Sequence, residues 1–128
     1  MFLAGYRVDA IGLIKGFDVF AMSSISEGMG TPLVDAMAAG RAAVATAVGG
    51  IPEVVLEGVT GYLVPPRDPA ALAGRIVELL KNQPLRERMG RAAWARAREC
   101  FTVETMVEKT AAVYKSLATG TANRAAVD

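Results

Sequence analysis

Two carboxylates flank the short glycine-rich segment that offers most for chemistry in this chain. Glu27 directly precedes Gly28, Met29 and Gly30, and Asp35 lies eight positions after Glu27. Glycines let the backbone approach a ligand closely, N–H groups at a helix start attract an anion, and carboxylates accept hydrogen bonds from hydroxyl groups. These properties together suit a ligand in which a sugar is joined to a phosphate.

The residues on either side predict that this segment links a strand to a helix. The apolar run at residues 18–22 is typical of a buried strand. Thr31 is expected to cap the following helix, with Pro32 in its first turn. Glu27 then lies at the mouth of the turn and Asp35 one helical turn inside, so both can face a ligand at the helix start. Taken singly, they are equally well interpreted as a solvated loop charge and a partner of the helix dipole.

The rest of the chain alternates predicted strands and helices. The expected strands are residues 2–4, 18–22, 42–48 and 61–64, and the expected helices between them are residues 8–15, 31–40 and 51–56. This order is typical of a parallel sheet with helices on its faces. Further helices are predicted to begin at Asp68, Pro84 and Thr102, each with an apolar stripe. Residues 119–128 lack periodicity and are predicted to form a frayed tail.

A second glycine-bearing turn is predicted at residues 47–53, Ala-Val-Gly-Gly-Ile-Pro-Glu, after the strand at residues 42–48. Because the strands are parallel, it lies on the same sheet edge as the first turn, which is the edge where ligands bind in such sheets. A plain strand-to-helix corner remains the alternative interpretation.

The composition excludes several classes of function. The 128 residues are about one domain, and the net charge of +1 gives no electrostatic case for a nucleic acid partner. The apolar runs are too short to span a membrane. The absence of histidine excludes Ser-His-Asp and Cys-His catalysis and the usual zinc ligands. Cys100 is the only cysteine, so a reduced, cytoplasmic setting is expected.

Two other patterns have simpler interpretations. A dinucleotide fingerprint would need Gly or Ala at position 33 and an acid at the end of the next strand, and Leu33 and Gly50 stand there instead. A nicotinamide or flavin site is therefore disfavoured.

Five arginines are interpreted as a solvated helix face, because acidic residues are interspersed among them. They are Arg86, Arg88, Arg91, Arg96 and Arg98.

Taken together, these segments resemble the carboxyl-terminal domain of family 4 glycosyltransferases, which are retaining, metal-independent enzymes of the two-Rossmann-domain GT-B fold. The matching runs are Phe-Leu-Ala-Gly-Tyr-Arg (2–7), Asp-Val-Phe-Ala-Met-Ser-Ser (18–24), Ser-Glu-Gly-Met-Gly-Thr-Pro-Leu-Val-Asp-Ala-Met-Ala-Ala-Gly (26–40), Val-Gly-Gly-Ile-Pro-Glu-Val-Val (48–55) and Gly-Tyr-Leu-Val-Pro-Pro (61–66). The likeness covers most of residues 1–118. It implies an α/β domain with an incomplete Rossmann-like parallel sheet followed by carboxyl-terminal helices.

The resemblance implies a role for each residue of the family's signature, which is Glu, seven residues, Glu. Glu27 matches the first Glu, which contacts the donor sugar near the reacting carbon. Asp35 matches the second, which grips the ribose hydroxyls, and is one methylene shorter, so that contact is lost or bridged by water. Backbone groups bind the rest of the nucleotide sugar: the sugar and phosphate at Gly28, Met29 and Gly30, the diphosphate at Thr31 and Leu33, and the base at Arg7 and Val8. No metal or cofactor is implied.

The resemblance also implies that part of the domain is absent. Such domains order their strands 3-2-1-4-5-6, and residues 2–4 would be strand 3, so strands 1 and 2 and one lip of the crevice are missing. The 128 residues also lack the Arg and Lys that clamp the diphosphate in this family. They lack the amino-terminal domain that binds the acceptor, and any peripheral membrane association would come from that missing domain. Residues 18–22 would then form an exposed edge, for which dimerisation, strand exchange or repacking of residues 2–4 remain open.

Several functions remain open at this point. The leading hypothesis is part of a retaining glycosyltransferase that uses a nucleotide-diphosphate sugar, with the isolated 128 residues inactive or nearly so. A truncated remnant or interaction module without chemistry is the alternative from another class. An epimerase or a phosphorylase on the same fold is a third. A phosphorylase would need a lysine-linked pyridoxal cofactor, for which no lysine site is apparent.

Overall fold

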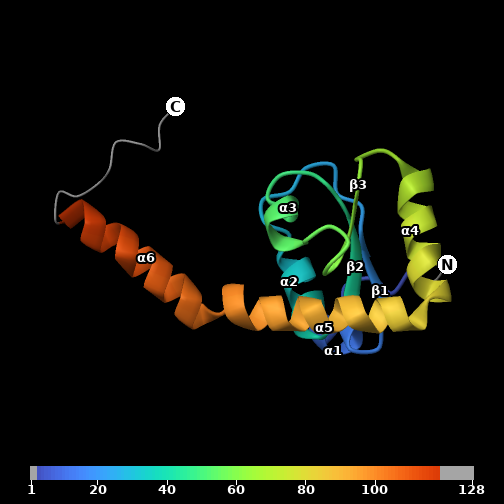
Figure 1. The fold of residues 1–128 in the computed structure, drawn as a ribbon, viewed down its shortest axis with the longest axis horizontal. Coiled ribbons are helices and arrows are strands. Elements are labelled where there is room, and N and C mark those ends of the chain that lie inside the picture. Colours follow the sequence, from blue (N-terminus) through green and yellow to red (C-terminus); the bar gives the residue numbers. More distant parts are fainter. Residues whose placement is uncertain (1–2, 119–128) are drawn as a thin grey trace.

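The described part of the chain is built on a three-stranded parallel sheet in the order β1-β2-β3 (Figure 1). The computed structural model describes residues 3–118, and its strands are β1 (Val19–Met22), β2 (Ala42–Thr46) and β3 (Gly61–Val64). Both neighbouring pairs are parallel, with Val19 opposite Ala42 and Ala43 opposite Gly61. The carboxyl ends of all three strands therefore meet at one edge, which is the upper edge in Figure 1.

The described residues also form six helices, of which the first five pack around the sheet (Figure 1). They are α1 (Ala10–Ile14), α2 (Thr31–Ala38), α3 (Ile51–Val54), α4 (Pro69–Lys81), α5 (Gln83–Cys100) and α6 (Val103–Ala118). One core lies between the sheet and α2, α3 and α5, and the other lies between the sheet, α4 and the first half of α5. None of these helices is long and apolar enough to cross a membrane.

Strand β2 lies at the centre because its residues can be buried on both faces. Every residue of this strand is buried. Ala43 and Ala45 contribute to the core under α2 and α5, whereas Ala42 and Val44 contribute to the core under α4. Their small side chains let helices approach the sheet closely from both sides, as is usual for parallel sheets covered by helices.

The helix starts show which capping predictions were right. Asp68 Oδ1 accepts a hydrogen bond from the Ala71 N–H (2.9 Å), so the predicted cap of α4 is confirmed. The predicted cap at Thr31 is wrong. Gly30 precedes α2 in a left-handed conformation (φ 76°), and no side chain caps this helix. Glycine adopts such a φ without a Cβ clash, so the turn uses backbone freedom in place of a capping side chain.

The first predicted strand does not form in the described residues. Residues 3–7 have no regular structure, and the side chains of Leu3 and Tyr6 are 79% and 93% exposed. A strand requires a neighbour for its ladder of hydrogen bonds, and β1 pairs only with β2 among the described strands. Repacking of residues 2–4 beside β1 was one alternative for this edge, and residues 3 and 4 do not pack in that way. Residue 2 lies outside the described part. The predicted tail at residues 119–128 also lies outside it.

Helix α6 extends away from the rest of the molecule (Figure 1). Its predicted apolar stripe includes Met106, Val113, Tyr114 and Leu117, which are all exposed, and none of its residues is buried. The helix forms as the pattern predicts, with Thr102 Oγ1 accepting from the Thr105 N–H (3.1 Å). Its stripe nevertheless packs against no core in the described residues.

Candidate functional site

The two glycine-bearing turns pack against each other at the carboxyl edge of the sheet. The Gly50 N–H donates to the carbonyl of Gly28 (2.7 Å). A Cβ added to Gly49 would lie 1.7 Å from the Glu27 carbonyl oxygen, and one added to Gly50 would lie 2.4 Å from that of Gly28. Because a side chain at either position would overlap backbone, the turns after β1 and β2 can form this single unit only with glycine there.

Glu27 lies at the entrance of the first turn, as the sequence predicts, and its carboxylate is held locally. Ser24 Oγ donates to Oε2 (3.3 Å), and the Gly28 N–H donates to Oε1 (3.2 Å). The Ser24 carbonyl in turn accepts from Thr46 Oγ1 at the end of β2 (2.5 Å). The side chain is half-buried, so its position is set by the edge of the sheet while part of it stays accessible.

Three consecutive amides follow this carboxylate. Within residues 3–118, the N–H groups of Met29, Gly30 and Thr31 donate to no backbone or side-chain acceptor. The Leu33 N–H donates to the Gly30 carbonyl (2.8 Å), so this amide is already engaged and is a poorer anion donor than the sequence suggested. Successive unpaired amides at a helix start are suited to a phosphate or another anion.

Asp35 lies in the second turn of α2 and is half-buried. Its carboxylate makes no hydrogen bond or ion pair with any residue of the described part. The carboxylate therefore remains available to a hydroxyl-bearing ligand. Glu27 and Asp35 thus belong to one turn and the helix that it opens.

Arg7 and Val8 are not brought to this unit. They precede α1, which lies at the amino edge of the sheet, whereas α3 and the glycine turns lie at the opposite edge (Figure 1). Arg7 instead forms an exposed ion pair with Asp9 (2.7 Å). That pairing raises the pKa of Arg7 and lowers the pKa of Asp9. The physical reason is that residues 3–7 do not form a strand of the sheet. Without that strand, they are not placed at the carboxyl edge where the glycine turns lie.

A hollow of about 270 Å³ adjoins the glycine turns. Its lining residues are Gly28, Met29, Gly50, Glu53, Val54 and Phe101. A more apolar hollow of about 300 Å³ is also lined by Met29 and Phe101 and reaches Met106 of α6. No sequence pattern indicates that Phe101 lies here, because it is 72 positions from Met29 in the chain.

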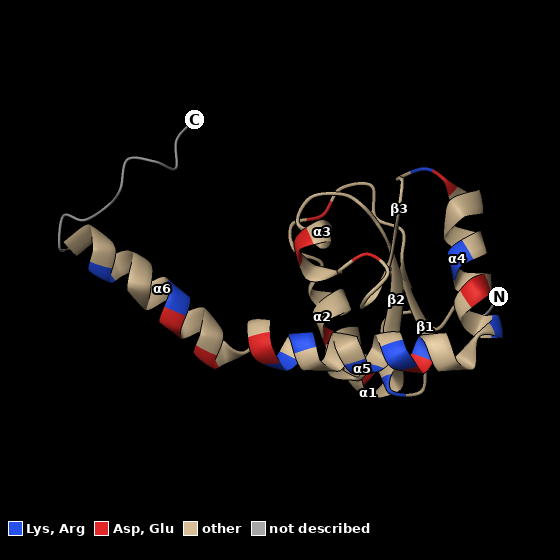
Figure 2. Cartoon of the chain, viewed as in Figure 1, with Lys and Arg blue, Asp and Glu red and all other residues tan. Residues whose placement is uncertain are grey.

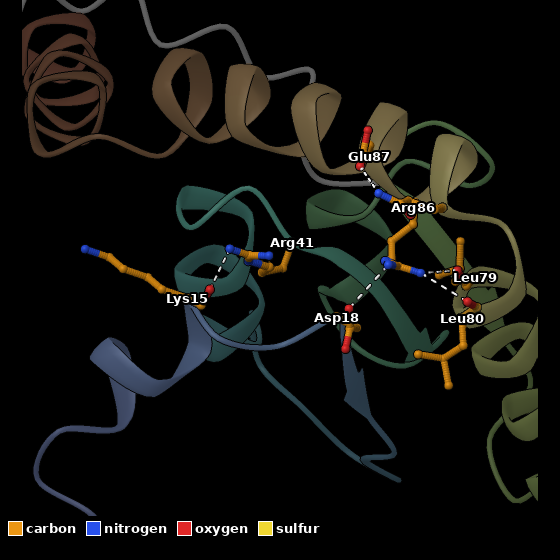
Figure 3. A network of polar contacts seen from close by, with 8 residues as sticks. Lys15, Asp18, Arg41, Leu79, Leu80, Arg86 and Glu87 are labelled. Atoms are coloured by element: carbon orange, nitrogen blue, oxygen red, sulfur yellow. Dashed lines mark hydrogen bonds and ion pairs between the residues drawn. The ribbon is translucent and has the colours of Figure 1, made fainter.

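The interpretation of the α5 arginines as a solvated face is wrong for two of the five. Figure 2 shows acidic and basic residues interspersed along α5, as the sequence indicates. Arg86 donates to the carbonyls of Leu79 (2.9 Å) and Leu80 (3.2 Å) and pairs with Asp18 (3.3 Å), as Figure 3 shows. Arg96 likewise donates to backbone carbonyls, at the end of α3. Each guanidinium thus binds the carboxyl-terminal end of a neighbouring helix, where cations are favoured.

In residues 3–118, no group of three or more His, Cys, Asp or Glu side chains is arranged to hold a metal ion.

Comparison with known families matches residues 1–96 to the family described as glycosyl transferases group 1. The D-inositol 3-phosphate glycosyltransferase of Streptomyces avermitilis is 44% identical over 100 residues, which are 78% of this chain and 21% of that protein. The N-acetyl-alpha-D-glucosaminyl L-malate synthase of Bacillus anthracis is 37% identical over 110 residues, which are 86% of this chain and 29% of that protein. The chain thus spans less than a third of the length of either relative.

Solved structures share the fold. Anabaena Alr3699/HepE in complex with UDP has a TM-score of 0.83 at 31% identity, covering 88% of this chain and 31% of that one. Sucrose-phosphate synthase from Thermosynechococcus elongatus has a TM-score of 0.81 at 27% identity, covering 94% of this chain and 30% of that one. The α/β fold with a parallel sheet, expected from the sequence, is confirmed.

Proposed function

Because the chain belongs to the glycosyl transferases group 1, we propose that it forms part of the donor-binding domain of a retaining family 4 enzyme. The donor is a nucleotide-diphosphate sugar. The likeness to an Anabaena protein solved with UDP and with UDP-glucose supports this donor class. In the GT-B arrangement, the described residues form the second half of that domain and one wall of the donor site.

The unpaired amides of Met29, Gly30 and Thr31 beside Glu27 carry this proposal. The diphosphate lies against these amides at the start of α2, where the helix dipole favours negative charge. Glu27 accepts hydrogen bonds from hydroxyls of the donor sugar and so orients its reacting carbon. Asp35 reaches the ribose directly or through water. Leu33, Arg7 and Val8 contribute less, given their positions in this structure.

The transfer step follows from this placement. The bond between the anomeric carbon and the diphosphate oxygen breaks, and the acceptor hydroxyl forms a new bond from the face that the diphosphate leaves, which retains configuration. The hydroxyl proton moves to the departing diphosphate. The amides at the helix start stabilise the charge that develops on the leaving group, a role that a metal ion fills in other enzymes.

The 128 residues alone bind a donor weakly and do not turn it over. The chain spans 21% of the Streptomyces relative and 31% of the Anabaena structure. The acceptor-binding domain and the cations that clamp the diphosphate belong, in this proposal, to other parts of the protein. With a single cysteine in the sequence, a cytoplasmic location also belongs to the proposal.

Isothermal calorimetry of the purified chain tests the donor class. UDP and UDP-glucose should bind in the presence of a metal chelator, because backbone amides hold the diphosphate. UMP and free glucose should bind at least about tenfold more weakly, since each lacks the diphosphate that carries most of the charge. Equal binding of UMP and UDP, or binding that requires a divalent cation, would contradict the proposed site.

A further inference from the structure

Helix α3 is too short to hold its own position. It comprises only Ile51–Val54 and directly follows the second glycine turn. An isolated helix of one turn is unstable in water, because forming the first turn costs more conformational entropy than its hydrogen bonds return. The last carbonyls of such a helix also need donors from elsewhere. The position of this turn therefore depends on contacts from outside it.

Ile51 and Val54 anchor one side of α3 in the core, and Arg96 of α5 supplies the donors for its last carbonyls. Its Nη2 donates to the Glu53 carbonyl (2.6 Å), and its Nε donates to the Val54 carbonyl (3.0 Å). The guanidinium lies over the ring of Phe101, 5.5 Å from its centroid, and Nη1 lies 3.9 Å from Cys100 Sγ. The planar fork of arginine can donate to two adjacent carbonyls at once, which the single ammonium of lysine cannot do in the same geometry.

The position of α3 is transmitted to the first glycine turn through one hydrogen bond and one close contact. Gly50, immediately before α3, donates its N–H to the Gly28 carbonyl (2.7 Å). Gly49 lies so close to the Glu27 carbonyl that no side chain fits between them. A shift of α3 must therefore move Gly28 and the amides that follow it.

The geometry points to Arg96 as a positioning residue for the loop of residues 27–31. It fixes α3 against α5, and α3 in turn fixes the Gly28 carbonyl and the orientation of the adjacent unpaired amides. Arg96 does not line the hollow beside the glycine turns, so it acts there through the backbone of α3. Its effect on nucleotide binding rests on the function proposed above, whereas its effect on the backbone does not.

The chain contains a matched control on the same helix. Arg86 Nη1 also donates to two carboxyl-terminal carbonyls of a helix, those of Leu79 and Leu80 in α4 (Figure 3). That end of α4 lies at the amino edge of the sheet, away from the glycine turns (Figure 1). Arg96→Gln and Arg86→Gln thus remove similar contacts from α5, but only the first loosens α3.

Amide hydrogen exchange measured by NMR on the 128-residue chain tests the backbone effect. Arg96→Gln should speed exchange at the Gly50 N–H about tenfold more than Arg86→Gln does, and should shift the amide signals of Met29, Gly30 and Thr31. Comparing the two variants removes any general loss of stability. Equal acceleration of Gly50 exchange in both variants would overturn the inference.

Titration with UDP tests the consequence for binding. Arg96→Gln should weaken UDP binding about tenfold, and Arg86→Gln should leave it unchanged. Arg96→Lys keeps the charge but loses the fork, so its UDP affinity should fall in step with its Gly50 exchange. Full rescue of UDP binding by lysine while Gly50 exchange stays fast would show a charge effect and overturn the positioning role. If the unsubstituted chain binds no UDP, the proposed function fails and the exchange result alone decides the role of Arg96.

Discussion

Single residues at the carboxyl edge of the sheet decide whether the site can form. Gly50 has almost no free space at its Cα, because the Gly28 carbonyl lies where a Cβ would be. The Gly-x-Gly segment alone is weak evidence for a ligand site, since tight turns use glycine for steric reasons. What the sequence could not show is that the second pair of glycines packs against the first. That contact joins residues about twenty positions apart.

Gly50→Ala should lower the free energy of unfolding by about 2 kcal/mol, because the added methyl overlaps backbone that cannot move without breaking the Gly28–Gly50 hydrogen bond. Gly74→Ala is the control, since nothing lies within 4 Å of its Cβ position in α4. That variant should be more stable by about 0.5–1 kcal/mol, as alanine favours a helix over glycine. Urea denaturation measures both. Two variants of equal stability would mean that the turns do not pack as described.

Glu27→Gln should weaken UDP-glucose binding about tenfold and leave UDP binding unchanged, because the carboxylate is assigned to the sugar and not to the diphosphate. Glutamine keeps an oxygen that can accept from the Gly28 N–H, so the turn should persist. Calorimetry with both ligands gives the comparison. An equal loss for UDP and UDP-glucose would remove the sugar contact from Glu27.

At the scale of elements, sequence patterns located most helices and strands but not their partners. β3 was predicted at its observed bounds, and α4 begins after the predicted cap. The strand at residues 2–4 was not confirmed, because the pattern of a strand says nothing about whether a neighbour is available. The start of α2 differed because Gly30 provides the turn that a capping side chain was expected to provide. The sequence could not distinguish Arg96 from a solvated helix residue, because the carbonyls that it binds lie 42 and 43 positions away in the chain.

The contact between α4 and β3 should make stability depend on pH. Tyr62 Oη donates to Glu78 (2.8 Å), and Arg75 donates to the same carboxylate (2.8 Å) while its guanidinium lies 4.2 Å from the Tyr62 ring centroid. These bonds, Arg75 first, lower the pKa of Glu78 below its ordinary 4.5. The stabilisation is therefore complete above about pH 4.5 and is lost as the pH falls through the lowered pKa.

Glu78→Gln is the corresponding test. The variant should be less stable than the parent chain at neutral pH, and the difference should shrink as the pH falls below about 4.5. Urea denaturation at a series of pH values measures the difference. A difference that stays constant from neutral to acidic pH would show that the Glu78 carboxylate contributes nothing as a charge.

At the scale of the whole molecule, the described residues form a core with one long helix beside it. All the buried residues of the described part lie in the sheet, helices α1 to α5 and their connecting segments, whereas α6 projects from them with an exposed apolar stripe (Figure 1). The sequence correctly predicted this helix and its stripe. It could not show that the stripe is uncovered, because periodicity identifies an apolar face without identifying what covers it.

Removal of residues 103–128 should leave the free energy of unfolding within about 0.5 kcal/mol of the full chain, because α6 buries no side chain. Helical content measured by circular dichroism should fall in proportion to the helix removed. A loss of several kcal/mol would mean that α6 packs against the core in solution.

In the proposed site, the amides at the start of α2 hold the diphosphate of a nucleotide sugar. The most direct measurement is a titration of the isotope-labelled chain with UDP-glucose, followed by the NMR signals of its backbone amides. The largest changes should occur at Met29, Gly30 and Thr31, with smaller ones at Gly50, and residues 3–9 should be unaffected. Changes concentrated elsewhere, or none at saturating UDP-glucose, would contradict the claim.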